Sequence, residues 1–193
     1  MHNSFALHFK DNNLLRSILH ETKVYHVQAG KIGVQNVKNK SFTVAADEPG
    51  KTFSVTVKGY YDLEPSTFPQ PEKLIAFSDI EGEFDPLRLL LQKNKVIDEQ
   101  FNWIFGKGHV IFAGDMFDRG EQVTECLWLM YSLEEKAKAA GGYVHFILGN
   151  HEIMNLSGDH RYARPKYAEN SKKIGFKRRA VFKDTFCDSI YCR

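Results

Sequence analysis

The chain has 193 residues, of which 42% are hydrophobic and 26% are charged, and its formal net charge is +2. Fifteen Phe and eight Tyr argue against a disordered chain, because disordered segments contain few aromatic residues and carry a high net charge. No apolar run approaches the roughly 20 residues that a helix needs to cross a bilayer, and the N-terminus lacks the pattern of a secretory signal. The three cysteines match neither a disulfide framework nor a zinc site. Composition therefore predicts a soluble, cytoplasmic protein without a membrane partner.

Residues 1–71 are predicted to form a β-rich extension. A short helix is expected over residues 12–20. Alternation of apolar and polar residues, the period of half-buried strands, follows at residues 24–27, 32–37, 41–45 and 52–57. Turn residues at 29–30 and 48–50 complete a small antiparallel meander. Three prolines between residues 65 and 71 then predict a stiff connector.

Residues 72–175 repeat the order strand, polar turn, helix. Short apolar runs at residues 74–77, 110–113 and 143–148 predict strands buried on both faces. The first is followed by Asp85 and Pro86, a pair typical of a helix start, and the second by a helix over residues 122–140. This order predicts an α/β fold, with helices flanking a mainly parallel sheet. Ligands bind beyond the carboxyl ends of such strands, where all three polar turns lie.

The rest of the chain, residues 176–193, is expected to be a basic tail, disordered or frame-shifted. From residue 164 onward there are nine Lys or Arg against three Asp or Glu, whereas the body of the chain is acidic. The basic run at residues 172–179 could contact nucleic acid. Because it lacks a series of aromatic residues for base stacking, we favour a solvated end and no nucleic-acid partner.

The three turns carry the polar side chains of a candidate site: Asp79, Glu81, Asp115, Asp118, Arg119, Asn150 and His151. Hard oxygen ligands suit a divalent cation, and two cations about 3.5–4 Å apart can share one carboxylate. A buried group of carboxylates would repel itself without cations. The planar guanidinium of Arg119 fits a phosphate. The sequence therefore predicts a metal site beside a phosphate site.

The turns also resemble the motifs of a known family. D-x-E-G at residues 79–82, G-D-x-x-D-R-G at 114–120 and G-N-H-E at 149–152 stand roughly 35 residues apart and resemble the calcineurin-like metallophosphoesterases. The second motif resembles that of the phosphoprotein phosphatase branch. The third motif with the residues after it, 149–159, resembles the Shewanella-like protein phosphatases. The resemblance covers residues 72–166 and implies a partial metallophosphoesterase sheet.

The resemblance implies a dinuclear metal site. Asp79 would ligate the first metal, Asp115 would bridge the two, and Asn150 would ligate the second. Glu81 stands where the family usually has His, and we expect it to be a ligand as well. Two divalent ions are expected, manganese first because carboxylates are hard donors, with iron, zinc or magnesium as alternatives. Glu152 is expected to act at a helix N-terminus rather than as a ligand.

The resemblance further implies a metal-dependent phosphomonoester hydrolase, protein-phosphatase-like, that uses a metal-activated hydroxide on a phosphorylated protein or a small phosphomonoester. Arg119 would clamp the phosphate, and His151, oriented by Asp118, would protonate the leaving oxygen. Cys126, on an apolar helix face, is expected to be a buried thiol rather than a nucleophile.

The chain departs from the family in one respect that keeps an alternative open. The family has two further histidines downstream of G-N-H-E, and no histidine occurs here after His160. The alternative is a truncated or frame-shifted chain that is catalytically impaired or inactive, retains only partial metal or phosphate binding, and exposes apolar sheet surface.

Overall fold

The computed structural model describes residues 4–8, 23–28, 31–37, 39, 41–58 and 65–173. The helix expected over residues 12–20, the turn at 29–30 and the basic tail at 176–193 lie outside the described residues.

A parallel sheet forms from the three apolar runs. It contains β6 (Leu74–Phe77), β7 (His109–Phe112) and β8 (Tyr143–Phe146), in the order β6-β7-β8. The register pairs Phe77 with Phe112 and Phe112 with Phe146, so the three carboxyl ends meet at one edge. The predicted α/β fold with a parallel sheet is confirmed.

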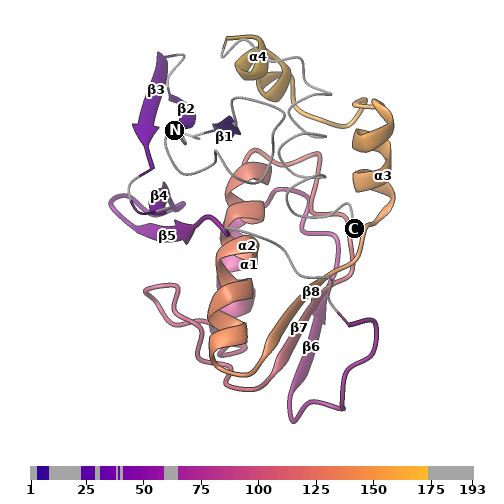
Figure 1. Ribbon diagram of the computed structural model, residues 1–193. Helices are drawn as coiled ribbons and strands as arrows, with labels where there is room; N and C mark the ends of the chain where they lie inside the picture. The colour runs from indigo at the N-terminus through magenta and orange to yellow at the C-terminus, as the bar shows by residue number, and fades with distance from the viewer. Residues whose placement is uncertain are drawn as a thin grey trace.

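Two helices cover one face of this sheet (Figure 1). They are α1 (Phe84–Lys93) and α2 (Val123–Ala139), the second within one residue of the predicted bounds. α1 begins earlier than expected, with Glu83 at the N-cap position. Pro86 is therefore the third helical residue, where the missing N–H has no intrahelical partner to lose.

The opposite sheet face contradicts the expectation of strands buried on both sides. Val110, Phe112 and Val144 are buried on the helix side, whereas Leu74 and Ile147 are 60% and 55% exposed. Alternation along each strand places these two sets on opposite faces. Among the described residues, the opposite face is covered only in part, where Phe68 packs against His109, Tyr143 and His145.

The N-terminal strands form two sheets instead of one meander. β1 (Ser4–His8), β2 (Lys23–Gln28) and β3 (Lys31–Asn36) pair antiparallel in chain order, and β4 (Ser41–Ala45) pairs with β5 (Thr52–Thr56) as a separate hairpin. β1 was not expected from the sequence. The apolar face of the hairpin packs against the helices.

Aromatic contacts join the hairpin to the helical core. Phe42 of β4 meets Trp128 of α2 edge-on, with ring centroids 5.2 Å apart. Phe53 of β5 stacks on Phe84 of α1 at 5.9 Å. All four side chains are buried, so the hairpin and the helices share one hydrophobic core.

Two further helices lie beyond the carboxyl ends of β6, β7 and β8 (Figure 1). They are α3 (Asn150–Ser157) and α4 (Pro165–Lys173). None of the helices in the described ranges is long and apolar enough to cross a membrane.

Candidate active site

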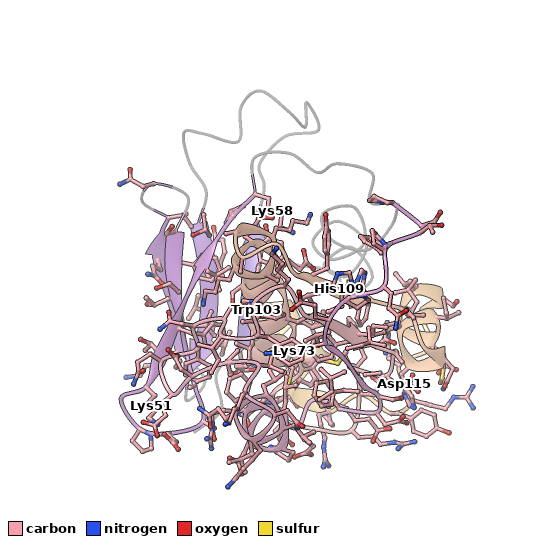
Figure 2. All side chains as sticks on the ribbon, turned by 90° about the horizontal axis from the view of Figure 1, so that it is seen from below. Lys51, Lys58, Lys73, Trp103, His109 and Asp115 are labelled. Carbon is pink, nitrogen blue, oxygen red and sulfur yellow. The ribbon has the colours of Figure 1, made fainter. Side chains whose placement is uncertain are left out.

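The three polar turns are tied together by backbone hydrogen bonds at the carboxyl edge of the sheet. The N–H of Asp79 donates to the carbonyl of Gly114 at 3.3 Å, and that of Glu81 donates to the carbonyl of Asp115 at 2.9 Å. The N–H of Gly120 donates back to the carbonyl of Glu81 at 2.8 Å. The first two motifs therefore form one unit. Figure 2 shows Asp115 on the opposite side of the molecule from Lys51 of the hairpin.

The backbone of these turns is strained at the predicted site residues. Eight non-glycine residues in the described ranges have positive φ, and five of them belong to the predicted site: Asp79, Glu81, Asp115, Asp118 and Arg119. A non-glycine residue in this region costs about 1–3 kcal/mol, and such residues cluster at functional sites. The backbone conformation that orients these side chains therefore lowers the stability of the fold.

Glu152 holds the second and third turns together. Its carboxylate accepts hydrogen bonds from the backbone N–H groups of Asp115, Met116 and Phe117 at 2.7, 2.8 and 3.1 Å. It also accepts from the N–H of Gly149 at 2.8 Å. Because four amides occupy this buried carboxylate, Glu152 serves as an acid at the start of α3, as expected.

The second and third turns touch through glycine. A Cβ on Gly149 would lie 2.4 Å from Oδ1 of Asp115, and one on Gly114 would lie 2.5 Å from the backbone of Gly149. No side chain larger than hydrogen fits at either position. This approach lets the N–H of His151 donate to Oδ1 of Asp115 at 2.9 Å.

His151 and Asp118 form a buried pair. Nδ1 of His151 lies 2.9 Å from Oδ2 of Asp118, and the two residues are 4% and 2% exposed. A carboxylate only accepts hydrogen bonds, so Nδ1 carries the hydrogen and the ring is fixed with Nε2 facing away. Nε2 lies 4.0 Å from Oε1 of Glu81. The structure thus brings together the predicted acid and the carboxylate expected to orient it.

Arg119 lies next to this pair and is exposed. Its guanidinium forms an ion pair with Oε1 of Glu81, the same oxygen that faces His151. It also lies 5.8 Å from the ring of Tyr162, whose centroid is 5.4 Å from that of the His151 ring. A planar, permanently charged donor therefore stands beside the imidazole at the surface.

Two residues of this site were not predicted from the sequence. Tyr162 contacts both Arg119 and His151, and Asn155 donates to the carboxylate of Asp118. Asn155 stands four residues after His151, and residues at this spacing share one face of a helix. That spacing could have identified Asn155, whereas no sequence pattern places Tyr162.

The family model described as calcineurin-like phosphoesterase matches residues 72–191. The chain belongs to the calcineurin-like phosphoesterase family.

Relatives within this family include two Shewanella-like protein phosphatases. The chain is 34% identical over 108 residues to Shewanella-like protein phosphatase 2 of Arabidopsis thaliana, covering 56% of this chain and 28% of that protein. It is 37% identical over 97 residues to Shewanella-like protein phosphatase 1 of Plasmodium berghei, covering 50% of this chain and 27% of that one. The chain therefore matches less than a third of the length of these relatives.

A solved structure of a similar fold is the cold-active protein-tyrosine phosphatase of a psychrophilic Shewanella species. The TM-score is 0.76 at 33% identity, over 89% of this chain and 52% of that chain. The likeness extends over both the parallel sheet and much of the N-terminal region.

Calcineurin-like phosphoesterases generally use divalent metals, and the donors here fit a hard cation only in part. Asp79 and Asp115 follow adjacent strands, and Asn150 is the first residue of α3. Their carboxylate and amide oxygens are the donors that manganese or magnesium prefers. Across the described ranges, however, no three His, Cys, Asp or Glu side chains converge as a metal site. The assignment of Glu81 as a ligand stays a prediction, because its carboxylate pairs with Arg119.

Cys126 is excluded as a nucleophile. The thiol lies in the core on α2 and is fully buried. Burial raises the pKa of this thiol well above its usual range, and the neighbouring carboxylate of Glu125 raises it further. The thiolate is the reactive form of cysteine, so Cys126 is a structural residue, as expected. Cys187 and Cys192 lie outside the described residues.

Proposed function

We propose that this calcineurin-like phosphoesterase is a metal-dependent phosphomonoester hydrolase of the protein phosphatase type. One observation carries the proposal: Arg119 and His151 both face Oε1 of Glu81, through an ion pair and at 4.0 Å respectively. An anionic oxygen thus lies between a permanent cation and an imidazole. In the proposal, a phosphate oxygen meets the same two groups in place of this carboxylate oxygen.

In this proposal, Arg119, Asp118 and His151 have separate roles. Arg119 binds the phosphate and orients it, because its fork matches two phosphate oxygens. Asp118 holds the imidazole of His151, and Nε2 of His151 gives a proton to the leaving oxygen as the ester bond breaks.

The remaining donors would hold the cations: Asp79, Glu81, Asp115 and Asn150. When bound, divalent cations supply a hydroxide nucleophile near neutral pH and neutralise charge on the phosphate. We propose two cations and place manganese first because of the hard oxygen donors. The positive φ of Asp79 and Asp115 supports the assignment, since strain concentrates at such sites.

A phosphorylated protein is the substrate class that the relatives support, since they carry the names of protein phosphatases and the solved neighbour that of a tyrosine phosphatase. A small phosphomonoester is the second substrate class. A cytoplasmic location rests on the cysteine composition alone.

A second function is an impaired domain that binds one metal or a phosphate without hydrolysing it. The observation that favours it is the ion pair between Glu81 and Arg119, which occupies a carboxylate expected to hold a cation. Arg119 would then bind phosphate while turnover would be missing.

Hydrolysis of p-nitrophenyl phosphate with and without Mn²⁺ separates the two functions. The proposal predicts metal-dependent turnover that falls about 100-fold or more in Asp115→Asn, which keeps the shape of the side chain but removes its charge. The control is Asp98→Asn, in the loop between α1 and β7, where activity should be unchanged. Phosphate binding by calorimetry without turnover in the wild type would establish the impaired domain instead.

A further inference from the structure

We propose that Asn155 is a positioning residue that holds Asp118 and, through it, aims the imidazole of His151 at the leaving oxygen. This inference rests on the role of His151 in the proposed function. It adds a member to the His151–Asp118 pair that neither the motifs nor the comparisons assign.

Asn155 is anchored inside the site. It lies on α3, one helical turn after His151, and is only 2% exposed. Its Nδ2 lies 2.9 Å from each carboxylate oxygen of Asp118 and 2.9 Å from the backbone carbonyl of His151. The side chain therefore contacts both members of the pair at once.

The orientation of the amide follows from its partners. Asp118 presents two oxygens that accept, so the NH₂ group must face them. The amide oxygen of Asn155 then faces Nδ1 of His160 at 3.2 Å, and an amide oxygen only accepts, so His160 donates. Hydrogen bonds thus run from His160 to Asn155 and from Asn155 to Asp118. Asp118 receives a second bond from His151.

This chain of bonds matters because few side chains donate to the carboxylate of Asp118. The residue has a φ of 71° in a loop and its carboxylate is buried. In the part of the chain that the structure describes, the side chains that donate to it are His151 and Asn155. Without Asn155, a buried carboxylate keeps one donor and can turn, and the imidazole turns with it.

A series of leaving groups tests the positioning role. Phenyl phosphate needs a proton on its leaving oxygen, whereas 2,4-dinitrophenyl phosphate releases a stable anion. General acid catalysis contributes about 100-fold or more to a rate. Asn155→Ala should therefore lower kcat for phenyl phosphate by about 10- to 100-fold, change kcat for the dinitrophenyl ester by less than about threefold, and leave both KM values unchanged.

Two variants make this result specific. Asn155→Ser keeps a hydroxyl donor and should recover part of the loss on phenyl phosphate. Ser157→Ala removes an exposed hydroxyl on the same helix that bonds only the carbonyl of Ile153, and both rates should be unchanged. Equal losses on the two esters in Asn155→Ala would show a general structural defect and overturn the positioning role.

Variant His151→Asn keeps the inference separate from the proposed function. If His151→Asn slows phenyl phosphate selectively and Asn155→Ala does not, the proposed function stands and the positioning role fails. If the wild type shows no turnover, the proposed function fails, and the test of Asn155 becomes spectroscopic.

The spectroscopic readout is the Nδ1–H proton of His151 in nitrogen-15-labelled protein. Its bond to Asp118 should give a downfield resonance in the wild type and in Ser157→Ala. We expect this resonance to shift or broaden in Asn155→Ala while circular dichroism stays unchanged. An unchanged resonance would contradict the positioning role, whether or not the chain has turnover.

Discussion

At the scale of one residue, the planar shape of the Arg119 guanidinium is expected to contribute to phosphate binding beyond its positive charge. Its guanidinium pairs with Glu81 and lies beside the ring of Tyr162. A lysine at this position keeps the charge but replaces a planar fork by a single ammonium group. Losing one charge-assisted hydrogen bond costs about 1.5 kcal/mol, or roughly tenfold in affinity. Steady-state kinetics of Arg119→Lys should therefore show KM raised about tenfold for each ester, with an unchanged ratio of their kcat values.

The matched control for Arg119 is Arg161→Lys. Arg161 is exposed and pairs with Asp159 two residues earlier in the chain. Its replacement should leave KM within about twofold of the wild type, since exposed ion pairs contribute little. A larger effect at Arg161 than at Arg119 would move the phosphate site to the loop after α3.

Site residues could be predicted from sequence where their chemistry is unusual. Carboxylates, an amide and an imidazole stand out where they follow apolar runs, so Asp79, Asp115 and His151 could be chosen as candidates in advance. The four hydrogen bonds that Glu152 accepts from backbone amides could not be predicted, because they depend on loop conformation. The contacts of Tyr162 with Arg119 and His151 could not be predicted for the same reason. Positive φ at aspartate, in particular, leaves no trace in a sequence pattern.

At the scale of elements, an ion-pair network fastens the β4–β5 hairpin to α1. The side chain of Arg88 bonds the carboxylate of Asp47 through Nε and Nη2 at 2.9 and 2.8 Å, and both side chains are largely buried. Burial is the largest single influence and would raise the pKa of Asp47, but the hydrogen bonds to its carboxylate, that from Arg88 first, and the charge of Arg88 together outweigh burial and lower that pKa. The charged carboxylate is therefore favoured in the folded state.

Asp47→Asn should lower the free energy of unfolding by about 2 kcal/mol at pH 7, because Arg88 is left buried with a weaker partner. A lowered pKa in the fold gives stability that is present above the unfolded value, about 3.9, and is lost as pH falls through the folded value. Urea unfolding should thus show the deficit shrinking below about pH 4. The control is Glu48→Gln, a more exposed partner of Arg88 at 3.5 Å, with an expected deficit below about 0.5 kcal/mol.

Elements themselves were predictable to different degrees. Strands β6 to β8 and helix α2 follow from apolar runs and helical spacing that tertiary contacts reinforce. The separation of β4–β5 from β1–β3 depends on which face of the hairpin meets α2, and that is a long-range contact. Exposure on one face of the parallel sheet was expected only under the alternative of a truncated chain, because an apolar run of four residues does not itself show which neighbours cover it.

At the scale of the whole molecule, the question is whether residues 1–71 and 72–175 behave as two domains, as the sequence predicts. Phe53 of the hairpin stacks on Phe84 and packs against Phe101, which belong to the second region. A shared core couples the stability of both regions, so they should unfold together.

Phe53→Ala tests this coupling. Removing a buried ring from the shared core should lower the free energy of unfolding by about 3–5 kcal/mol. Trp128 lies under the hairpin, whereas Trp103 bonds the carbonyl of Gly106, in the loop that leads into β7. In Trp103→Phe and Trp128→Phe backgrounds, each with one remaining tryptophan, Phe53→Ala should lower the urea midpoint by a similar amount whichever tryptophan reports it. If the Trp103 signal kept its midpoint while that of Trp128 shifted, the hairpin would be a separate domain with its own stability.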